Sequence, residues 1–192
     1  GRLQVSEDLI FTIRSYVTIS IGNLSITAFP KLHVASDPQS FIVECSKVRV
    51  GVFTDIGAPC EHVVRHFQQC HAAFLEANYD EDMLTNGSYP YHLKNRIRSD
   101  RGHMSNDQAL ELFARYPPPY MSHLFLSHLS RDNNSPKIVK NAFNRIAGGT
   151  RIIIASRDRE TSLYHIRDSV KALLPIQKTP PSAHRKLQLS LF

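Results

Sequence analysis

The chain has 192 residues, of which 42% are hydrophobic and 21% charged, a composition typical of a globular domain and not of a fibrous or disordered chain. No apolar run is long enough to span a membrane and no signal pattern opens the sequence, so we expect a cytoplasmic protein without a membrane partner. The 23 Lys and Arg residues exceed the 17 Asp and Glu residues, and the net charge of +6 favours an anionic partner such as nucleic acid.

The first part of the chain has the pattern of a β-sheet. Residues 23–29 alternate polar and apolar side chains, as a half-buried strand does. Residues 40–45 and 47–53 are two β-rich runs joined at Ser46, which predicts a hairpin. Residues 1–20 show no clear pattern.

From Pro59 onward, predicted helices alternate with predicted strands. Pro59 fits the first turn of a helix, and Ser105 with Gln108 matches the capping box of another. The other predicted elements are strands at 72–77, 121–126 and 151–155 and helices at 91–98 and from 136 to Gly148. This order predicts an α/β (α+β layered) domain over residues 1–172, followed by a loosely ordered tail at 173–192.

Four polar clusters follow predicted strands. They are residues 31–38, which include His33, residues 54–57, which include Asp55, residues 75–82 and residues 126–134. Strand ends are where layered α/β folds place ligands, and histidine with carboxylate suits a divalent metal such as zinc or manganese. A single cluster of this kind is more often a polar loop or a helix cap, but four together favour a metal site.

His103 and His128 each lie shortly before a predicted helix, whose free N–H groups suit a phosphate. Another pair, His62 and His66, has ligand-like spacing, but Arg65 lies between them where a catalytic glutamate would be expected, so we interpret the pair as solvated surface residues. The sequence contains no G-x-S-x-G motif and no phosphate-binding glycine motif, so nucleophilic serine catalysis and nucleotide folds have no support.

An ordered series of short motifs resembles a known family. The series is EANYDEDML at 76–84, GSYP at 87–90, GHMSN at 102–106 and HLSRDNN at 128–134. Between residues 25 and 155 it is similar to the YycJ-type (WalJ, VicX) branch of the metallo-β-lactamase superfamily, whose fold is an αββα sandwich. Each motif alone would be weak, whereas the ordered series is specific.

The resemblance implies a metal-dependent hydrolase, a phosphodiesterase or exonuclease-like enzyme acting on nucleic acid, with one or two zinc or manganese ions. It implies His33, Asp55 and His128 as metal ligands and Asp55, His103 and His128 as catalytic groups. Asn78, Ser105, Asn134 and Arg131 would contact the substrate. We expect His33, Asp55 and His128 to lie within roughly 8 Å of one another, as a shared metal site requires.

The chain departs from the family pattern in that it contains no H-x-H-x-D-H metal loop, as if it were the C-terminal part of the fold. Val34 follows His33 where the family has aspartate, and Tyr79 stands where other members often carry histidine. We therefore expect weak or no metal binding by these residues alone. We also expect a preceding segment or a second copy of the chain to cover the exposed sheet.

Two alternative functions remain open. One is a non-catalytic or degenerate binding module that retains a relic of the metal site. The other is a small-molecule hydrolase acting on a thioester or lactone, which an apolar pocket would favour over a basic groove.

Overall fold

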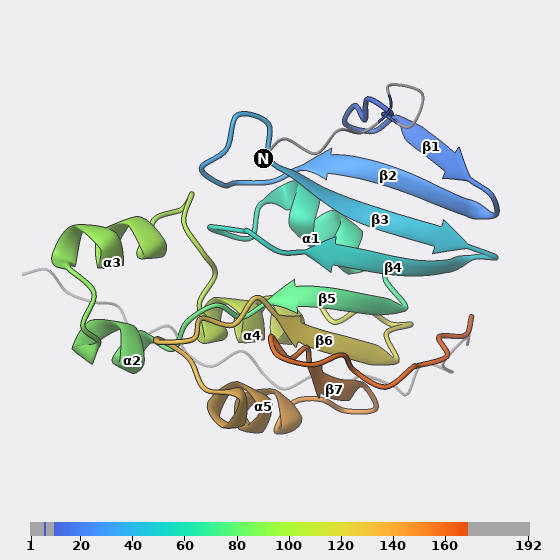
Figure 1. Ribbon diagram of the computed structural model, residues 1–192. Helices are drawn as coiled ribbons and strands as arrows, with labels where there is room; N and C mark the ends of the chain where they lie inside the picture. Colours follow the sequence, from blue (N-terminus) through green and yellow to red (C-terminus); the bar gives the residue numbers. More distant parts are fainter. Residues whose placement is uncertain (1–5, 7–9, 169–192) are drawn as a thin grey trace, which may run out of the picture.

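The computed structural model describes residue 6 and residues 10–168, so the predicted tail at 173–192 lies outside the described residues. Seven strands form one sheet in chain order (Figure 1). The pairs from β1 to β4 are antiparallel and those from β4 to β7 are parallel. The strands are β1 (Thr18–Ile21), β2 (Leu24–Pro30), β3 (Gln39–Cys45), β4 (Val48–Phe53), β5 (Ala72–Glu76), β6 (His123–Ser127) and β7 (Arg151–Ile154).

Parallel strands need crossover connections, and helices provide them here. The helices are α1 (Glu61–Phe67), α2 (Glu81–Asn86), α3 (Tyr91–Arg98), α4 (Asn106–Arg115) and α5 (Pro136–Asn144). Buried side chains of α1, α4 and α5 pack against one face of the sheet, whereas α2 and α3 lie beyond the ends of β5 and β6 (Figure 1). The main core joins strand residues such as Phe53 and Leu75 to helix residues such as Phe67, Leu112 and Phe143.

The predicted α/β layering is confirmed, and local sequence explains most of it. The hairpin between β3 and β4 turns at Ser46 and Lys47, whose φ angles of 47° and 69° are those of a two-residue hairpin loop. Both halves of the predicted capping box are present at the start of α4, between Ser105 and Gln108.

Several element predictions were wrong in detail. Pro59 precedes the N-cap of α1, which is Cys60, so Pro59 is not in the first turn. Strand β1 and helix α2 were not predicted, because the first is short and exposed and the second is a six-residue polar helix. Helix α5 ends at Asn144, before the glycine pair that was expected to end it.

The second face of the sheet carries an apolar row that runs across the strands in register: Phe41, Val52, Phe74, Phe125 and Ile153. Tyr164 and Ile166 pack against its β5–β7 end, where Phe74 and Phe125 stack with ring centroids 4.6 Å apart. The β3–β4 end of the row is half-buried. The expectation that a preceding segment or a second copy covers this face stays a prediction.

None of the helices within the described part of the chain is long and apolar enough to cross a membrane. The cytoplasmic location stays a prediction.

Candidate metal centre

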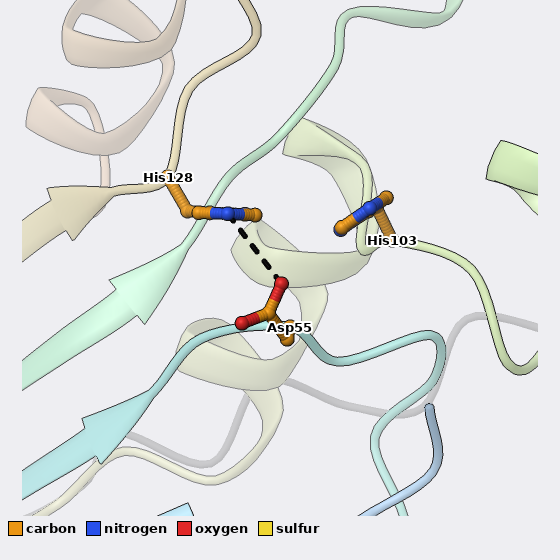
Figure 2. A group of neighbouring side chains, drawn as sticks. All are labelled: Asp55, His103 and His128. Carbon is orange, nitrogen blue, oxygen red and sulfur yellow. Dashed lines mark ion pairs between the residues drawn. The ribbon is translucent and has the colours of Figure 1, made fainter. Parts of the chain in front are cut away.

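The candidate site lies at the carboxyl ends of the parallel strands β4, β5 and β6. Asp55 follows β4, Glu76 is the last residue of β5, and His128 directly follows β6. Because neighbouring parallel strands end at the same edge, these side chains meet there although the chain separates them widely. His103, from the segment between α3 and α4, faces the same point (Figure 2).

The side chains at this edge are close enough to share an ion. His128 Nε2 lies 3.5 Å and His33 Nε2 3.8 Å from Asp55 Oδ1. Ligand atoms of Asp55, His103 and His128 all lie within 4.8 Å of one another. The expected convergence of His33, Asp55 and His128 is therefore observed, whereas their role as metal ligands stays a prediction.

A buried carboxylate, Glu76, anchors two of the histidines. Glu76 Oε1 lies 2.7 Å from His103 Nδ1 and 3.0 Å from His128 Nδ1. Glu76 Oε2 accepts a hydrogen bond of 2.6 Å from the backbone N–H of Ile56. The side chain of Glu76 is 0% exposed, so every contact it makes is with protein.

These contacts fix which nitrogen each histidine offers. A carboxylate oxygen can only accept, so Nδ1 of His103 and of His128 must donate to Glu76. His33 Nδ1 likewise donates to the carbonyl of Gly102 at 2.9 Å. In the neutral rings the Nε2 atoms of the three histidines therefore keep their lone pairs, which is the arrangement found in histidines that bind metals. Sequence reasoning placed Glu76 in a polar cluster but gave it no role.

The backbone at the site is strained at two positions. Asp55 and His128 have φ angles of 54° and 57°, a left-handed conformation that costs a non-glycine residue about 1–3 kcal/mol. At His128 the carbonyl accepts a hydrogen bond of 2.8 Å from the Asn78 side chain. The surrounding loops thus hold the strained conformation, which directs the His128 ring towards Asp55.

Three residues predicted to contact the substrate are buried, which are Asn78 at 9% exposed, Ser105 and Asn134, and the last two are held by hydrogen bonds within the protein. Ser105 is 6% exposed and its Oγ accepts the backbone N–H of Gln108. Asn134 is 5% exposed; its amide pairs with that of Asn106, donates to the carbonyls of Ala77 and Asn78, and accepts from the N–H of Ser135. A substrate contact through either side chain would require these bonds to break.

An open pocket of about 670 Å³ lies over the site. His33, His103, His128 and Asn78 line it together with four arginines, which are Arg96, Arg101, Arg131 and Arg157. Asn78, although buried, and Arg131 both line the pocket, and their contact with a substrate stays a prediction. Arg157, which follows β7, was not predicted at the site.

The predicted surface pair on α1 is only half correct. His62 is exposed and its Nδ1 lies 2.6 Å from the hydroxyl of Tyr16. His66 is half-buried and stacks on Phe29, with ring centroids 4.1 Å apart. Neither lies among the residues that line the pocket.

The environments of His128 and His66 predict different titrations. The hydrogen bond to Glu76 raises the pKa of His128, with a further contribution from the charge of Asp55, whereas burial lowers the pKa of His66. In the metal-free protein, NMR titration of the ring protons should therefore show His128 taking up its proton at a higher pH than His66. If His66 protonates first as the pH falls, the hydrogen-bonded arrangement around Glu76 is incorrect.

The donor set fits a divalent transition metal. One carboxylate oxygen and up to three Nε2 atoms are the ligands that zinc and manganese sites use. The buried Glu76 beneath two of the rings supplies the supporting hydrogen bonds that such sites require.

Residues 5–128 match the family model described as a beta-lactamase superfamily domain. The chain belongs to the metallo-β-lactamase superfamily. It is 27% identical over 146 residues to the exodeoxyribonuclease YycJ of Bacillus anthracis, covering 76% of this chain and 54% of that protein. It is 31% identical over 134 residues to the exodeoxyribonuclease WalJ of Streptococcus pneumoniae, covering 70% of this chain and 49% of that protein. The chain thus spans about half the length of the curated relatives it matches.

Solved structures of other proteins share the fold. The metallo-β-lactamase fold protein YhfI of Bacillus subtilis matches with a TM-score of 0.57 and 13% identity, over 77% of this chain and 55% of that one. Zn²⁺-bound PqqB of Methylobacterium extorquens matches with a TM-score of 0.55 and 16% identity, over 80% of this chain and 52% of that one. At these identities the likeness concerns the superfamily fold alone.

Proposed function

We propose that this protein is a metal-dependent phosphodiesterase that cleaves nucleic acid, and that the chain supplies one part of its metal site. The observation that carries the proposal is the orientation of the three histidines. Each donates its Nδ1 proton to a protein acceptor and keeps Nε2 available beside Asp55, beneath a pocket lined by arginines.

His33, Asp55, His103 and His128 would hold one or two zinc or manganese ions, which when bound would activate a water and stabilise charge on the phosphate. Glu76 keeps the rings of His103 and His128 in place through their Nδ1 atoms. A histidine not engaged by metal can donate a proton from Nε2 to the leaving oxygen, with Glu76 stabilising the imidazolium. The arginines of the pocket offset the negative charge of the substrate.

Nucleic acid as the substrate has three supports. The curated relatives carry the name exodeoxyribonuclease. The chain has a net charge of +6. The pocket over the site has a basic lining, whereas a thioester or lactone hydrolase would be expected to offer an apolar pocket.

The test uses the full-length protein and an end-labelled DNA strand. With manganese or zinc the strand should shorten, and a chelator should stop the reaction until metal is restored. The same preparation should be assayed on a thioester and a lactone. Cleavage of either of these with DNA left intact would replace the nuclease with a small-molecule hydrolase, and DNA binding without any cleavage would point to a binding module.

A further inference from the structure

The pocket over the metal centre is lined by four arginines from two parts of the chain: Arg96 and Arg101 from α3 and the segment after it, and Arg131 and Arg157 from the loops after β6 and β7. We infer that these two pairs of arginines hold the phosphates that flank the scissile one. The site would therefore take a nucleic-acid strand in preference to an isolated phosphate ester. This inference rests on the proposed function.

Three arginines elsewhere in the fold have acidic partners, which the arginines of the pocket lack. Among the described residues other arginines, such as Arg65 and Arg145, also lack one, so what distinguishes the four is that they line one pocket. Arg49, Arg98 and Arg115 each pair with a glutamate. Within the described part of the chain, Arg96, Arg101 and Arg131 make no ion pair with a carboxylate. All three are exposed. Unpaired cations held close together repel one another, so an arrangement that keeps them at one pocket suits an anionic ligand.

The loops after β6 and β7 supply the other two guanidinium groups. Arg131 belongs to the loop that follows β6, and Arg157 donates to the Leu129 carbonyl of that same loop at 2.7 Å. Asp132, a carboxylate that also lines the pocket, accepts a hydrogen bond of 2.8 Å from the Tyr89 hydroxyl. This bond orients the carboxylate but leaves its charge, so the pocket keeps a net positive lining of four arginines against one aspartate.

Helix α3 is packed directly onto the segment that carries His103, which gives its arginines a defined place. A Cβ on Gly102 would lie 2.1 Å from the Ile97 carbonyl oxygen, so only glycine allows this approach. The backbone N–H of His103 donates to that same carbonyl at 2.8 Å. Arg96 is in the last turn of α3 and Arg101 directly precedes Gly102. The contact between α3 and the His103 segment therefore fixes the backbone of both arginines relative to His103.

Other basic residues of α3 have structural partners. Arg98 pairs with Glu81 of α2, and Lys94 Nζ donates to the Thr85 carbonyl at 2.8 Å. These contacts join α3 to α2. Arg98 and Lys94 thus hold α3 against α2, whereas Arg96 of the same helix lines the pocket.

The number of free guanidinium groups favours a polymer. Arginine binds phosphate through two parallel hydrogen bonds, so each group can hold one phosphate oxygen pair. Metal bound by His33, Asp55, His103 and His128 would hold the reacting phosphate. A small ester offers no further phosphate, whereas a nucleic-acid strand presents additional ones on both sides of the scissile bond.

The binding test uses the full-length protein, a chelator to prevent cleavage, and a fluorescent single-stranded oligonucleotide followed by anisotropy. For Arg96→Ala/Arg101→Ala, the Kd should rise about tenfold at low salt, and the slope of log K against log salt should fall in magnitude by about 1.4, the value for two lost phosphate contacts on a single strand. Arg96→Lys/Arg101→Lys should keep most of the slope, because lysine retains the charge.

The matched control is Arg115→Ala/Lys140→Ala, which removes the same net charge from exposed positions on α4 and α5 that do not line the pocket. It should bind like the wild type. Equal losses in the control and the pocket variant would show a general charge effect and overturn the inference, as would an unchanged slope in the pocket variant.

A hydrolysis arm separates this inference from the proposed function. The ratio of kcat/KM for the oligonucleotide to that for bis(p-nitrophenyl) phosphate should fall about tenfold in Arg96→Ala/Arg101→Ala, matching the binding loss. An equal loss on both substrates would place the arginines at the scissile phosphate and overturn the inference. If the wild type cleaves neither substrate, the proposed function fails, while the anisotropy result still decides whether the pocket binds a strand.

Discussion

Replacing Glu76 by glutamine should weaken zinc binding about 10- to 100-fold, the range seen when the partner of a metal-binding histidine is removed. The carboxylate accepts three hydrogen bonds, from His103, His128 and the Ile56 backbone. A glutamine has the same shape but only one accepting oxygen. Whichever way its amide lies, an NH2 group faces a donor, which is either the two histidines or the Ile56 N–H. In both orientations the negative charge that holds the Nδ1 protons of the histidines is lost.

This effect is measured by competition between the protein and a chromophoric chelator. Glu111→Gln is the matched control, because Glu111 is exposed and pairs only with Arg115 across one turn of α4. Its metal affinity should equal that of the wild type. A Glu76→Gln protein with wild-type affinity would mean that the histidines do not depend on the buried carboxylate for their orientation.

Asp55→Asn should lower DNA hydrolysis by the full-length protein at least about 100-fold, comparable to losing a group that stabilises the transition state. Asp55 Oδ1 is the atom around which His33 and His128 converge. The substitution keeps the shape of the side chain but removes its charge and one donor oxygen. Folding should be preserved, because asparagine tolerates the left-handed backbone that Asp55 adopts, with φ of 54°.

The measurement combines strand shortening with urea denaturation, so that loss of activity is not confused with loss of structure. Asp37→Asn, at an exposed position in the loop that also carries His33, provides the control and should remain active. Full activity in Asp55→Asn would remove Asp55 from the metal centre.

Sequence periodicity and spacing predicted correctly those features that depend on interactions between residues close together in the chain. The capping box at Ser105 and the hairpin turn at Ser46 depend on residues within a few positions, and both are found as predicted. The convergence of His33, Asp55 and His128 could also be predicted, because each follows a strand and parallel strands end at one edge.

The features of the site that could not be predicted from the sequence depend on tertiary packing. Glu76 ends an apolar strand, and nothing nearby in the sequence reveals that its oxygen lies beneath two histidines from distant segments. The amide pairing of Asn134 with Asn106 at the start of α4 is likewise a contact between distant segments, which spacing in the sequence does not reveal. Arg157 is 26 positions from Arg131, and only the folded chain brings both to one pocket.

The amide contacts of Asn134 also bear on the order in which the site forms during synthesis. Its side chain joins the loop after β6 to the carbonyl of Ala77, a residue 57 positions earlier in the chain. A nascent chain that has emerged only as far as β5 can begin the sheet, but it has neither His128 nor the loop that holds it. His33, Asp55 and His103 emerge before this loop, whereas His128 joins them only after the loop docks, so the full set of candidate ligands is assembled last.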